Sequence, residues 1–349
     1  MKNIIVTGGC GFIGSNFIVK HLAKNDNKIL NIDNLSYSAN LENLLSVDKN
    51  SSYHFQRGDI GNNEVISKAF NSFKPHLIIN FAAETHVDRS IDDPDKFITT
   101  NVLGTLNLLK VSLKYFKTEK DFKFIHVSTD EVYGSLDLKS KPFTELSAYQ
   151  PNSPYSASKA SSDHLVRAWF ETYGLPTIIT NCTNNYGPYQ FPEKLIPLIV
   201  ANCLGEKPLP IFGDGLQLRD WLFVDDHCSA LDLIIKNGKI GSRYIIGSNK
   251  ERKNIDIVKK ICKILDELNP RKNGSYKDLI TFVKDRPGHD FRYAIDSSKI
   301  HKELNWQPKE SFDSGLLKTV KWYVKNQDWW KKIQKNTYKQ ERLGLKNYE

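Results

Sequence analysis

Residues 7–14 read TGGCGFIG, and this glycine-rich octapeptide decides the fold. It follows a short apolar run and precedes a helical pattern at 14–25. A strand, a glycine turn and a helix in this order are typical of a dinucleotide-binding unit, with the anion at the helix N-terminus. We expect Gly8 to permit the turn, Gly11 to let the backbone approach a pyrophosphate and Gly14 to allow close helix packing.

Asp33 lies 19 residues after Gly14, at the end of the next apolar run, KILNID. A carboxylate at this place accepts hydrogen bonds from the ribose hydroxyls of adenosine and repels a 2′-phosphate, which favours NAD over NADP. The alternative is a glycine turn with a capping Asp and no cofactor. The spacing TGxxGxxG resembles the short-chain dehydrogenase/reductase superfamily.

Short apolar runs alternate with longer helical patterns in the first half of the chain. The runs expected as strands are 3–8, 28–33, 53–59, 76–83, 123–129 and 176–181. The patterns expected as helices are 14–25, 63–73, 96–116 and 153–174. The alternation predicts an α/β fold, a Rossmann-type doubly wound parallel sheet with a smaller, mostly C-terminal α/β substrate lobe.

The alternation weakens from about residue 190, where prolines gather. We therefore predict an NAD-binding Rossmann domain at 1–188 and a smaller lobe mainly at 189–349. Later segments near 220–250, RDWLFVDDHCSAL and RYIIGS, are expected to return to the sheet.

Charge and cysteine usage narrow the class of protein. The formal net charge is +9, and the basic excess lies at 231–349, which holds 27 Lys and Arg against 15 Asp and Glu. Scattered lysines suit a solvated surface better than a nucleic-acid groove, so we expect no nucleic-acid partner. Five cysteines without CxxC spacing predict reduced thiols in a cytoplasm and no metal site. The chain has no run of about 18 apolar residues, so no membrane span is expected.

The pattern SPYSASK predicts a helix with Ser153 as N-cap and Pro154 as first residue. Tyr155 and Lys159 are then one turn apart on one face, and we expect them to meet. A phenol titrates near about 10, so a tyrosine base needs its pKa lowered by roughly three units. Lys159, a nicotinamide cation and the helix N-terminus act in that direction. In isolation such a pair is more often a matter of packing, but YxxxK again resembles the same superfamily.

Residues 127–134 read VSTDEVYG and place Asp130 and Glu131 side by side. Acidic pairs at loop tips are often solvated and without function. This pair, however, follows a strand at its carboxyl end, where parallel sheets bind ligands. On an extended strand the two side chains point to opposite faces, so a shared task requires the backbone to turn directly after the strand.

Several long motifs together resemble one family. STDEVYG, YSASKASSDHLV, AAETHVDRS, NNYGPYQFPEKLIP, RDWLFVDDH and RPGHD are similar to the nucleoside-diphosphate-glucose 4,6-dehydratases, most of all those that act on dTDP-glucose. The resemblance runs from residue 3 to about 345, where the chain reads ERLGL. It implies loss of water from dTDP-glucose, with tightly bound NAD regenerated in each turnover. Helices at 97–116 and 154–173 would pair across a two-fold axis, giving a homodimer.

The resemblance implies a role for each catalytic residue. Tyr155 would take the proton of the sugar 4-hydroxyl with Lys159 in support, and Thr129 would hydrogen-bond the 4-hydroxyl or ketone. Glu131 would act as base at C5, while protonated Asp130 would donate to the departing C6 hydroxyl. One carboxyl must keep its proton near neutral pH, which burial beside a second carboxylate favours. The sequence leaves open which of the two keeps it.

The same resemblance implies two sets of binding residues. For NAD they are Gly8, Gly11, Phe12, Ile13, Gly14, Asp33, Asn34, Ser36, Asp59, Ile60, Phe81, Ala82, Ala83, Thr100, Tyr155, Lys159 and Asn185. For the nucleotide sugar they are Thr85, Thr129, Asn184, Lys194, Leu195, Pro210, Phe212, Arg219, Asn254, Arg286 and His289. Arg and Lys with amide donors suit a diphosphate, although each alone is more often a surface group.

Three departures from the family pattern leave alternatives open. Cys10 stands where Ala is usual, Phe212 stands where Tyr is common, and GSNKERKN before Asn254 lacks the usual GGHNE form. The last two lie near the nucleoside, so a UDP-, CDP- or GDP-hexose is an alternative substrate. A UDP-hexose 4-epimerase would need Tyr155 but no acid pair. A non-enzymatic NAD-binding regulator on the same fold would need neither.

Overall fold

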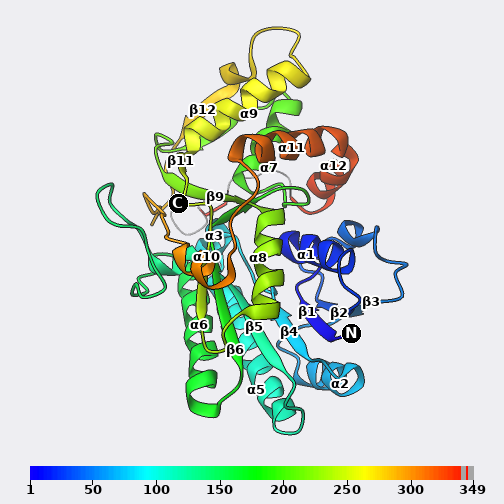
Figure 1. The fold of residues 1–349 in the computed structure, drawn as a ribbon. Coiled ribbons are helices and arrows are strands. Elements are labelled where there is room, and N and C mark those ends of the chain that lie inside the picture. Colours follow the sequence, from blue (N-terminus) through cyan, green and yellow to red (C-terminus); the bar gives the residue numbers. More distant parts are fainter. Residues whose placement is uncertain (339–342, 345–349) are drawn as a thin grey trace.

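The computed structural model describes residues 1–338 and 343–344. Parts of the expected second lobe and of the ERLGL motif, at 339–342 and 345–349, lie outside the described residues. A parallel sheet with helices on both faces fills the lower part of Figure 1, and a second lobe lies above it.

Seven parallel strands form the main sheet. In spatial order they are β10 (Arg243–Ile246), β6 (Thr177–Cys182), β5 (Lys123–Thr129), β4 (Leu77–Asn80), β1 (Asn3–Thr7), β2 (Lys28–Asp33) and β3 (Tyr53–Arg57). The strand order reverses at β1, which is the arrangement of a doubly wound sheet. The predicted fold class is therefore confirmed.

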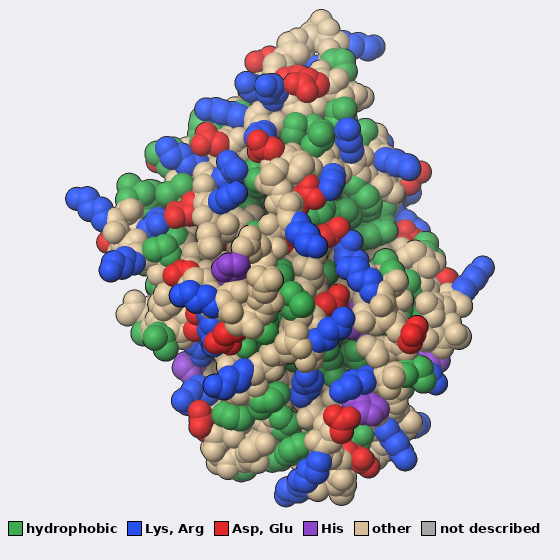
Figure 2. All heavy atoms as spheres, in the orientation of Figure 1, with side chains coloured by type: hydrophobic (Ala, Val, Ile, Leu, Met, Phe, Trp, Pro, Cys, Tyr) green, Lys and Arg blue, Asp and Glu red, His purple; other side chains and the backbone are tan. Residues whose placement is uncertain are grey.

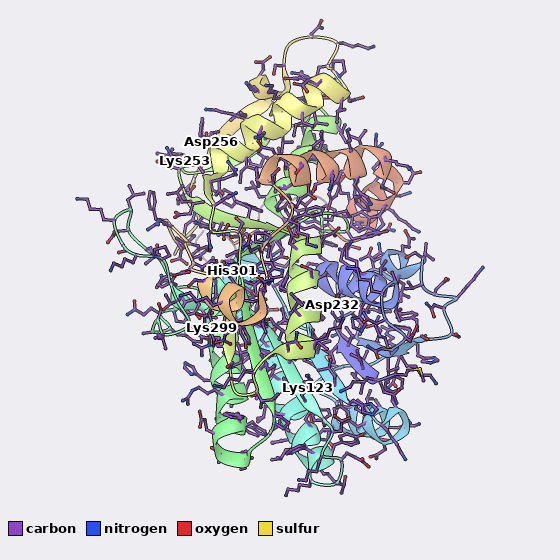
Figure 3. All side chains as sticks on the ribbon, in the orientation of Figure 1. Lys123, Asp232, Lys253, Asp256, Lys299 and His301 are labelled. Carbon is purple, nitrogen blue, oxygen red and sulfur yellow. The ribbon has the colours of Figure 1, made fainter. Side chains whose placement is uncertain are left out.

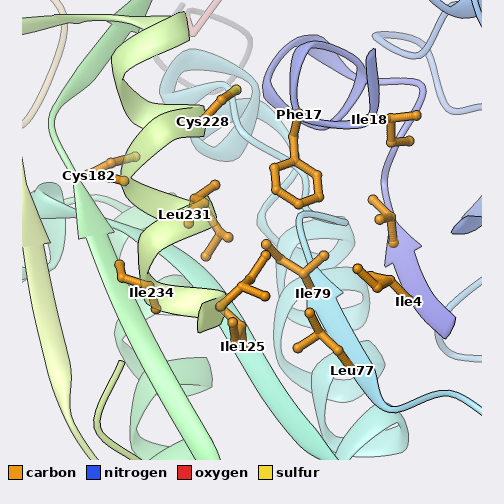
Figure 4. Packing of buried hydrophobic residues seen from close by; sticks show 14 of the residues in the cluster. Ile4, Phe17, Ile18, Leu77, Ile79, Ile125, Cys182, Cys228, Leu231 and Ile234 are labelled. Carbon is orange, nitrogen blue, oxygen red and sulfur yellow. The ribbon is translucent and has the colours of Figure 1, made fainter. Parts of the chain in front are cut away.

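Helices cover both faces of this sheet because its strands are apolar on both sides. They are α1 (Phe12–Leu22), α2 (Asn63–Phe73), α5 (Thr105–Phe116), α6 (Pro154–Tyr173) and α8 (Val224–Asn237). Ile4 of β1 packs with Phe17 of α1 and Leu231 of α8, as Figure 4 shows. The next residue, Ile5, points to the other face and packs with Phe70 of α2.

The helix expected over 96–116 is interrupted. It consists of α4 (Pro94–Phe97), a π-helical segment η2 (Ile98–Gly104) and α5, and follows the short helix α3 (Val87–Asp92). Asn101 explains the local distortion, because its side chain accepts from Glu84 N at 2.8 Å and donates to Glu84 O at 3.0 Å. Such π-helical turns occur mainly at functional sites.

The second lobe has its own core and two small sheets, β11-β9-β7 and β12-β8. Its strands are β7 (Asn184–Tyr186), β8 (Leu209–Phe212), β9 (Leu218–Phe223), β11 (Glu251–Lys253) and β12 (Ile280–Val283). The helices after residue 189, besides α8, are α7 (Leu195–Leu204), α9 (Asn254–Leu268), η4 (Tyr276–Leu279), α10 (Ser298–Leu304), α11 (Phe312–Lys325) and α12 (Gln327–Asn336). α10 packs on β10 rather than in the upper core.

The expected return of RDWLFVDDHCSAL to the main sheet is correct only for its second half, VDDHCSAL, which begins α8 and packs on that sheet. The segment RDWLF belongs to β9, which pairs in parallel with β7 and not with a strand of the main sheet. The reason is that β7 continues beyond the end of β6 after Thr183, so β9 is added to this extension. RYII, by contrast, is β10, the edge strand beside β6.

The two lobes are tied together near the glycine turn. Trp329 of α12 donates from Nε1 to Asn43 Oδ1 at 3.0 Å, and Asn43 Nδ2 donates to Cys10 O at 3.1 Å. Asn43 belongs to the short helix η1 (Leu41–Leu44). α12 therefore contacts η1, and η1 in turn is hydrogen-bonded to Cys10 in the glycine turn.

The surface carries both signs of charge. On the face drawn in Figure 2, Lys and Arg side chains are interspersed with Asp and Glu rather than gathered in one stripe. All five cysteines are buried and unpaired by disulfides. In the described part of the chain, no helix is long and apolar enough to cross a membrane. Within those same residues, no group of three or more His, Cys, Asp and Glu is arranged to hold a metal ion.

Leu231→Ala should destabilise the fold without touching the site. Leu231 is fully buried between α8 and the sheet, and removal of such a side chain leaves a cavity that costs about 2–5 kcal/mol. The free energy of unfolding in urea measures the loss. Leu146→Ala is the matched control, because Leu146 is 96% exposed, and equal stabilities of the two variants would contradict this assignment of the core.

Candidate active site

The glycine turn is tight because three backbone segments approach one another. Gly8 has φ +71°, and a Cβ on it would lie 2.6 Å from Ala82 N, while a Cβ on Gly14 would lie 2.5 Å from Gly8 O. Asp33 orders this turn by accepting hydrogen bonds from Cys10 N at 2.9 Å and Leu35 N at 2.8 Å. Only glycine leaves room for a ligand against this backbone.

A large pocket begins at this turn and runs along the carboxyl ends of β1, β4 and β5. Its lining includes nearly the whole set of residues expected to bind NAD, namely Gly8, Gly11, Phe12, Ile13, Gly14, Asp33, Asn34, Ser36, Ile60, Phe81, Ala82, Ala83, Thr100, Tyr155, Lys159 and Asn185. Asp59 does not line it, since its carboxylate accepts from Asn34 Nδ2 at 3.2 Å and Gly61 N at 2.7 Å. The residues present fit an extended dinucleotide with its pyrophosphate at the N-terminus of α1.

Tyr155 is held at the start of α6 by the expected cap. Ser153 Oγ accepts from Ser156 N at 3.1 Å, and Ser156 Oγ accepts from Ser153 N at 3.0 Å. Pro154 is the first helical residue, and Tyr155 N donates to Ser90 Oγ at 3.1 Å. The phenol therefore enters the pocket from a rigid helix end.

Lys159 does not meet Tyr155 as expected. Its Nζ donates to Val127 O at 2.9 Å and lies 3.5 Å from His126 Nε2, so it points toward β5. Both side chains line the same pocket one helical turn apart. The spacing was predicted correctly, but the backbone carbonyl of β5 is a better partner for a buried ammonium than a neutral phenol.

The pKa of Tyr155 lies well above 10 in this structure, because burial raises it and the nearby Glu131 raises it further. A hydrogen bond with the Thr129 side chain opposes these effects. Positive charge in the pocket would oppose this rise in pKa and favour the phenolate.

Asp130 and Glu131 leave β5 on a turn. The chain passes directly into the short helix η3 (Asp130–Tyr133), whose N-cap is Thr129, and Thr129 Oγ1 accepts from Glu131 N at 3.2 Å. This is the turn that the sequence analysis required of a cooperating acid pair. Glu131 lines the pocket, whereas Asp130 is 1% exposed and lies behind the lining residues.

The two carboxyl groups differ in their surroundings. Burial, Glu131 and Asp220 raise the pKa of Asp130 well above its usual range, and only Arg219 opposes them among the charged groups. Burial also raises the pKa of Glu131, but Arg286, Lys194 and Arg219 all lower it. Asp130 Oδ2 has no hydrogen-bond partner among the described residues. Asp130 is therefore the better proton carrier and Glu131 the better base.

The cations around Glu131 come from separate segments. Lys194 Nζ donates to Thr85 O at 2.8 Å, Arg286 Nη1 lies 3.4 Å from Asp88 Oδ1, and Arg219 Nη2 donates to Asp290 O at 2.7 Å. These three residues are far apart in the sequence and were expected to bind a diphosphate. In the fold, all three lie near enough to Glu131 to lower its pKa.

The other residues expected at the nucleotide end lie around the second lobe. Of that whole set, Thr85, Thr129, Asn184 and Lys194 line the main pocket, whereas those outside its lining are Leu195, Pro210, Phe212, Arg219, Asn254, Arg286 and His289. Phe212 and His289 pack edge to face, with ring centroids 6.4 Å apart. Burial and the charges of Arg286 and Arg219 lower the pKa of His289 to about 4, so its ring is neutral.

Several buried polar atoms at this end have no hydrogen-bond partner among the described residues. They are Oδ1 of Asn184, Oδ1 of Asn254 and Nε of Arg286. A bound polar ligand would remove this cost.

Sequence reasoning missed Glu193. It lines the pocket with its side chain almost fully buried, accepts from Tyr37 Oη at 2.7 Å and pairs with Arg89 Nε at 2.8 Å. Its place beside Lys194 in the motif PEKLIP was the available signal.

Comparison with known proteins matches this geometry to one family. A family model described as GDP-mannose 4,6 dehydratase matches residues 5–319. The dTDP-glucose 4,6-dehydratase of Neisseria meningitidis is 52% identical over 99% of this chain and 99% of its own length. The chain belongs to the dTDP-glucose 4,6-dehydratase family.

Solved structures agree with membership of the dehydratase family. The dTDP-glucose 4,6-dehydratase of Streptomyces venezuelae, solved with NAD bound, is 42% identical and superposes with a TM-score of 0.88 over 95% of this chain and 99% of its own. The UDP-glucose 4-epimerase of Thermotoga maritima is 30% identical, with a TM-score of 0.82 over 93% and 99%. The higher identity favours the dehydratase over the epimerase interpretation.

Asp130→Asn should stabilise the protein at neutral pH. A carboxyl whose pKa is raised in the folded state costs stability as pH rises above its unfolded value of about 3.9, by roughly 1.4 kcal/mol per pH unit until the folded pKa is reached. The gain of the variant over the wild type should therefore grow as the pH rises above about 4, until the raised pKa of the folded state is reached. Urea unfolding at several pH values measures it, and parallel curves for both proteins would contradict a protonated Asp130.

Proposed function

We propose that this protein is an NAD-dependent hydro-lyase that converts dTDP-glucose to dTDP-4-keto-6-deoxyglucose. The observation that carries the proposal is the buried Asp130 next to the pocket-lining Glu131, both close to Tyr155, in a chain with close identity to dehydratases over its full length. An epimerase needs no acid and base on neighbouring carbons, so this pair has a task only if water is eliminated.

The residues that would hold NAD are those that line the pocket from the glycine turn to Lys159. Asp33 would accept from the adenosine ribose, and the tight turn at Gly8 would leave the backbone of the α1 N-terminus to the pyrophosphate. Bound NAD⁺ supplies a hydride acceptor for C4 and, once reduced, a hydride donor for C6. Because the redox state is restored in each turnover, we expect the cofactor to stay bound.

The first chemical task is the oxidation at C4. Tyr155 takes the proton of the 4-hydroxyl, and Thr129 hydrogen-bonds the same oxygen, which becomes the ketone. Lys159 adds positive charge one turn away, which lowers the cost of forming the phenolate.

The second task is the loss of water. The 4-ketone acidifies the proton on C5, which Glu131 removes, while Asp130 gives its proton to the C6 hydroxyl as the C6–O bond breaks. The raised pKa of Asp130 favours retention of that proton, and the cations near Glu131 oppose the rise in its pKa that burial causes. The proton on Glu131 then returns to C5 when C6 receives the hydride.

The nucleotide end of the substrate would lie beyond Asn184 and Lys194, which line the main pocket, among residues of the second lobe. Lys194, Arg219 and Arg286 would neutralise the diphosphate, and Asn184 and Asn254 would donate to the nucleotide from their amide nitrogens. Phe212 and His289 would flank the base, with Leu195 and Pro210 beside them. Five buried thiols also suit a reducing compartment, and we propose a cytoplasmic location.

Purified protein with a panel of dTDP-, UDP-, CDP- and GDP-glucose should release one product, one water lighter than dTDP-glucose, by mass spectrometry. Glu131→Gln should lower turnover by at least about a hundredfold, since it removes the base at C5, yet still form the 4-ketone and accumulate the near-ultraviolet absorbance of reduced nicotinamide. Tyr155→Phe is the matched control, because it should abolish that absorbance as well.

Two results would overturn the proposal. Unchanged dTDP-glucose in the presence of NAD would exclude the reaction, and full activity of Glu131→Gln on a UDP-hexose would point to the epimerase. A higher kcat/KM for another nucleotide would change the base but keep the reaction.

We also propose a homodimer that pairs the helices around α5 and α6 of two copies. Apolar side chains are exposed along this region, with Leu103 at 53% and Tyr173 at 52%. Leu103→Glu should therefore lower the mass measured by light scattering from two chains to one, because it places charge in an apolar interface. Leu146→Glu, at a fully exposed loop position, is the control, and a single-chain mass for the wild type would refute the dimer.

A further inference from the structure

A stripe of three functional groups follows one face of α6. Tyr155, Lys159 and Asp163 are spaced by four residues, so they lie one above the other on the side of the helix that faces β5 and β6. Asp163 has no exposed surface, and the reaction outlined above gives it no task. A buried carboxylate is costly unless it is paired, so its presence behind Lys159 requires a reason.

The hydrogen bonds of Asp163 favour its charged form. Tyr149 Oη donates to its Oδ2 at 2.6 Å, and Asn181 Nδ2 donates to the same oxygen at 2.9 Å. Oδ1 accepts no hydrogen bond of ordinary geometry within the described residues, but His126 Nε2 lies 3.5 Å from it. Two donors on one oxygen favour the charged form against the burial that raises the pKa of this carboxyl.

His126 is fixed as a neutral ring whose proton faces Asp163. Thr7 Oγ1 donates to Asn80 Oδ1 at 2.6 Å, which turns Asn80 Nδ2 toward His126 Nδ1 at 3.2 Å. Since an amide nitrogen can only donate, Nδ1 accepts and the ring proton is on Nε2. Burial and the charge of Lys159 hold the pKa of His126 well below its usual value, so the ring does not take a second proton.

Lys159 completes this buried network. His126 Nε2 lies 3.5 Å from both Lys159 Nζ and Asp163 Oδ1. With its proton on Nε2, the ring can donate to Asp163 but cannot accept from Lys159, so it lies between the ammonium and the carboxylate without holding Lys159 itself. Lys159 is only 4% exposed, and the charge of Asp163 opposes the burial that lowers its pKa.

We propose that Asp163 is a positioning residue, whose negative charge holds Lys159 as a fixed cation on the carbonyl of Val127, one helical turn from Tyr155, with the neutral ring of His126 between the two charges. The inference rests on the proposed function, because it assigns to Lys159 the electrostatic support of the C4 oxidation. Without the carboxylate, the buried ammonium loses its counter-charge and gives up its proton at lower pH.

Other titratable groups also face this network. Cys182 of β6 lies near Lys159, and burial raises the pKa of its thiol to about 12, so it stays neutral. Arg243 of β10 lies over the ring of Tyr149 at 4.5 Å and keeps positive charge on the far side of Asp163. The carboxylate that raises the pKa of Lys159 is therefore Asp163, whereas the carboxylates that raise the pKa of Tyr155 are Glu131 and Asp130.

Single-turnover reduction of the bound nicotinamide by dTDP-glucose isolates the C4 step, and its rate can be followed against pH. In Asp163→Asn the alkaline limb of this profile should move down by about one pH unit, with the rate near pH 8 lowered about tenfold. The KM for the sugar nucleotide should stay within about twofold, because the nucleotide-binding groups are untouched.

Asp232→Asn is the matched control. Asp232, labelled on α8 in Figure 3, also forms a partly buried pair with a histidine, at 2.7 Å from His21 Nδ1, but His21 and Asp232 do not line the pocket. It should lower stability and leave the pH profile in place. A profile of Asp163→Asn that has the wild-type shape, or an equal shift in Asp232→Asn, overturns the inference.

Tyr149→Phe keeps the proposal testable if Asp163→Asn does not fold. It removes one donor from Asp163 and leaves the carboxyl group, so the alkaline limb should move in the same direction by a smaller amount. An unchanged limb overturns the inference. If the wild type itself does not reduce its nicotinamide with dTDP-glucose, the proposed function fails instead.

Discussion

Asp130 is buried at the carboxyl end of β5 and Glu131 lies partly buried beside it, and two neighbouring carboxylates with little access to water cannot both ionise cheaply. The protein resolves this conflict by giving each a different environment. Asp220 and Glu131 favour a proton on Asp130, while three cations favour charge on Glu131. The acid and the base that water elimination needs are thus set by the charges around them rather than by residue type.

The same cations connect the two lobes. Lys194 lies at the start of α7, Arg219 in β9 and Arg286 in the loop after β12. All three lower the pKa of Glu131, which follows the carboxyl end of β5 in the main sheet. A diphosphate bound among them would take up part of their positive charge and so alter the pKa of Glu131. In the proposed function, substrate binding and the strength of the base would therefore be coupled through a few charged groups.

A second buried polar network lies between β5 and α6. Thr7, Asn80, His126 and Asp163 lie across β1, β4, β5 and α6, so that the glycine turn and the active-site lysine share one chain of contacts. Buried polar groups of this kind are stable only when nearly all their hydrogen bonds are made. Lys123, labelled in Figure 3, is the first residue of β5, at the end of the strand opposite to the active site. It donates to Ile235 O at 2.5 Å, which fixes this end of the strand against α8.

The sequence by itself determined the local features. Glycine spacing, strand and helix periods and the Ser153 cap predicted the parallel sheet, the turn at Gly8 and the place of Tyr155, because these depend on neighbours along the chain. Only the tertiary structure decided that Lys159 turns to Val127, that β9 pairs with β7, and that the pKa of Asp130 is raised more strongly than that of Glu131. These depend on burial and on charges that come from distant segments, and a linear pattern does not record which of them meet.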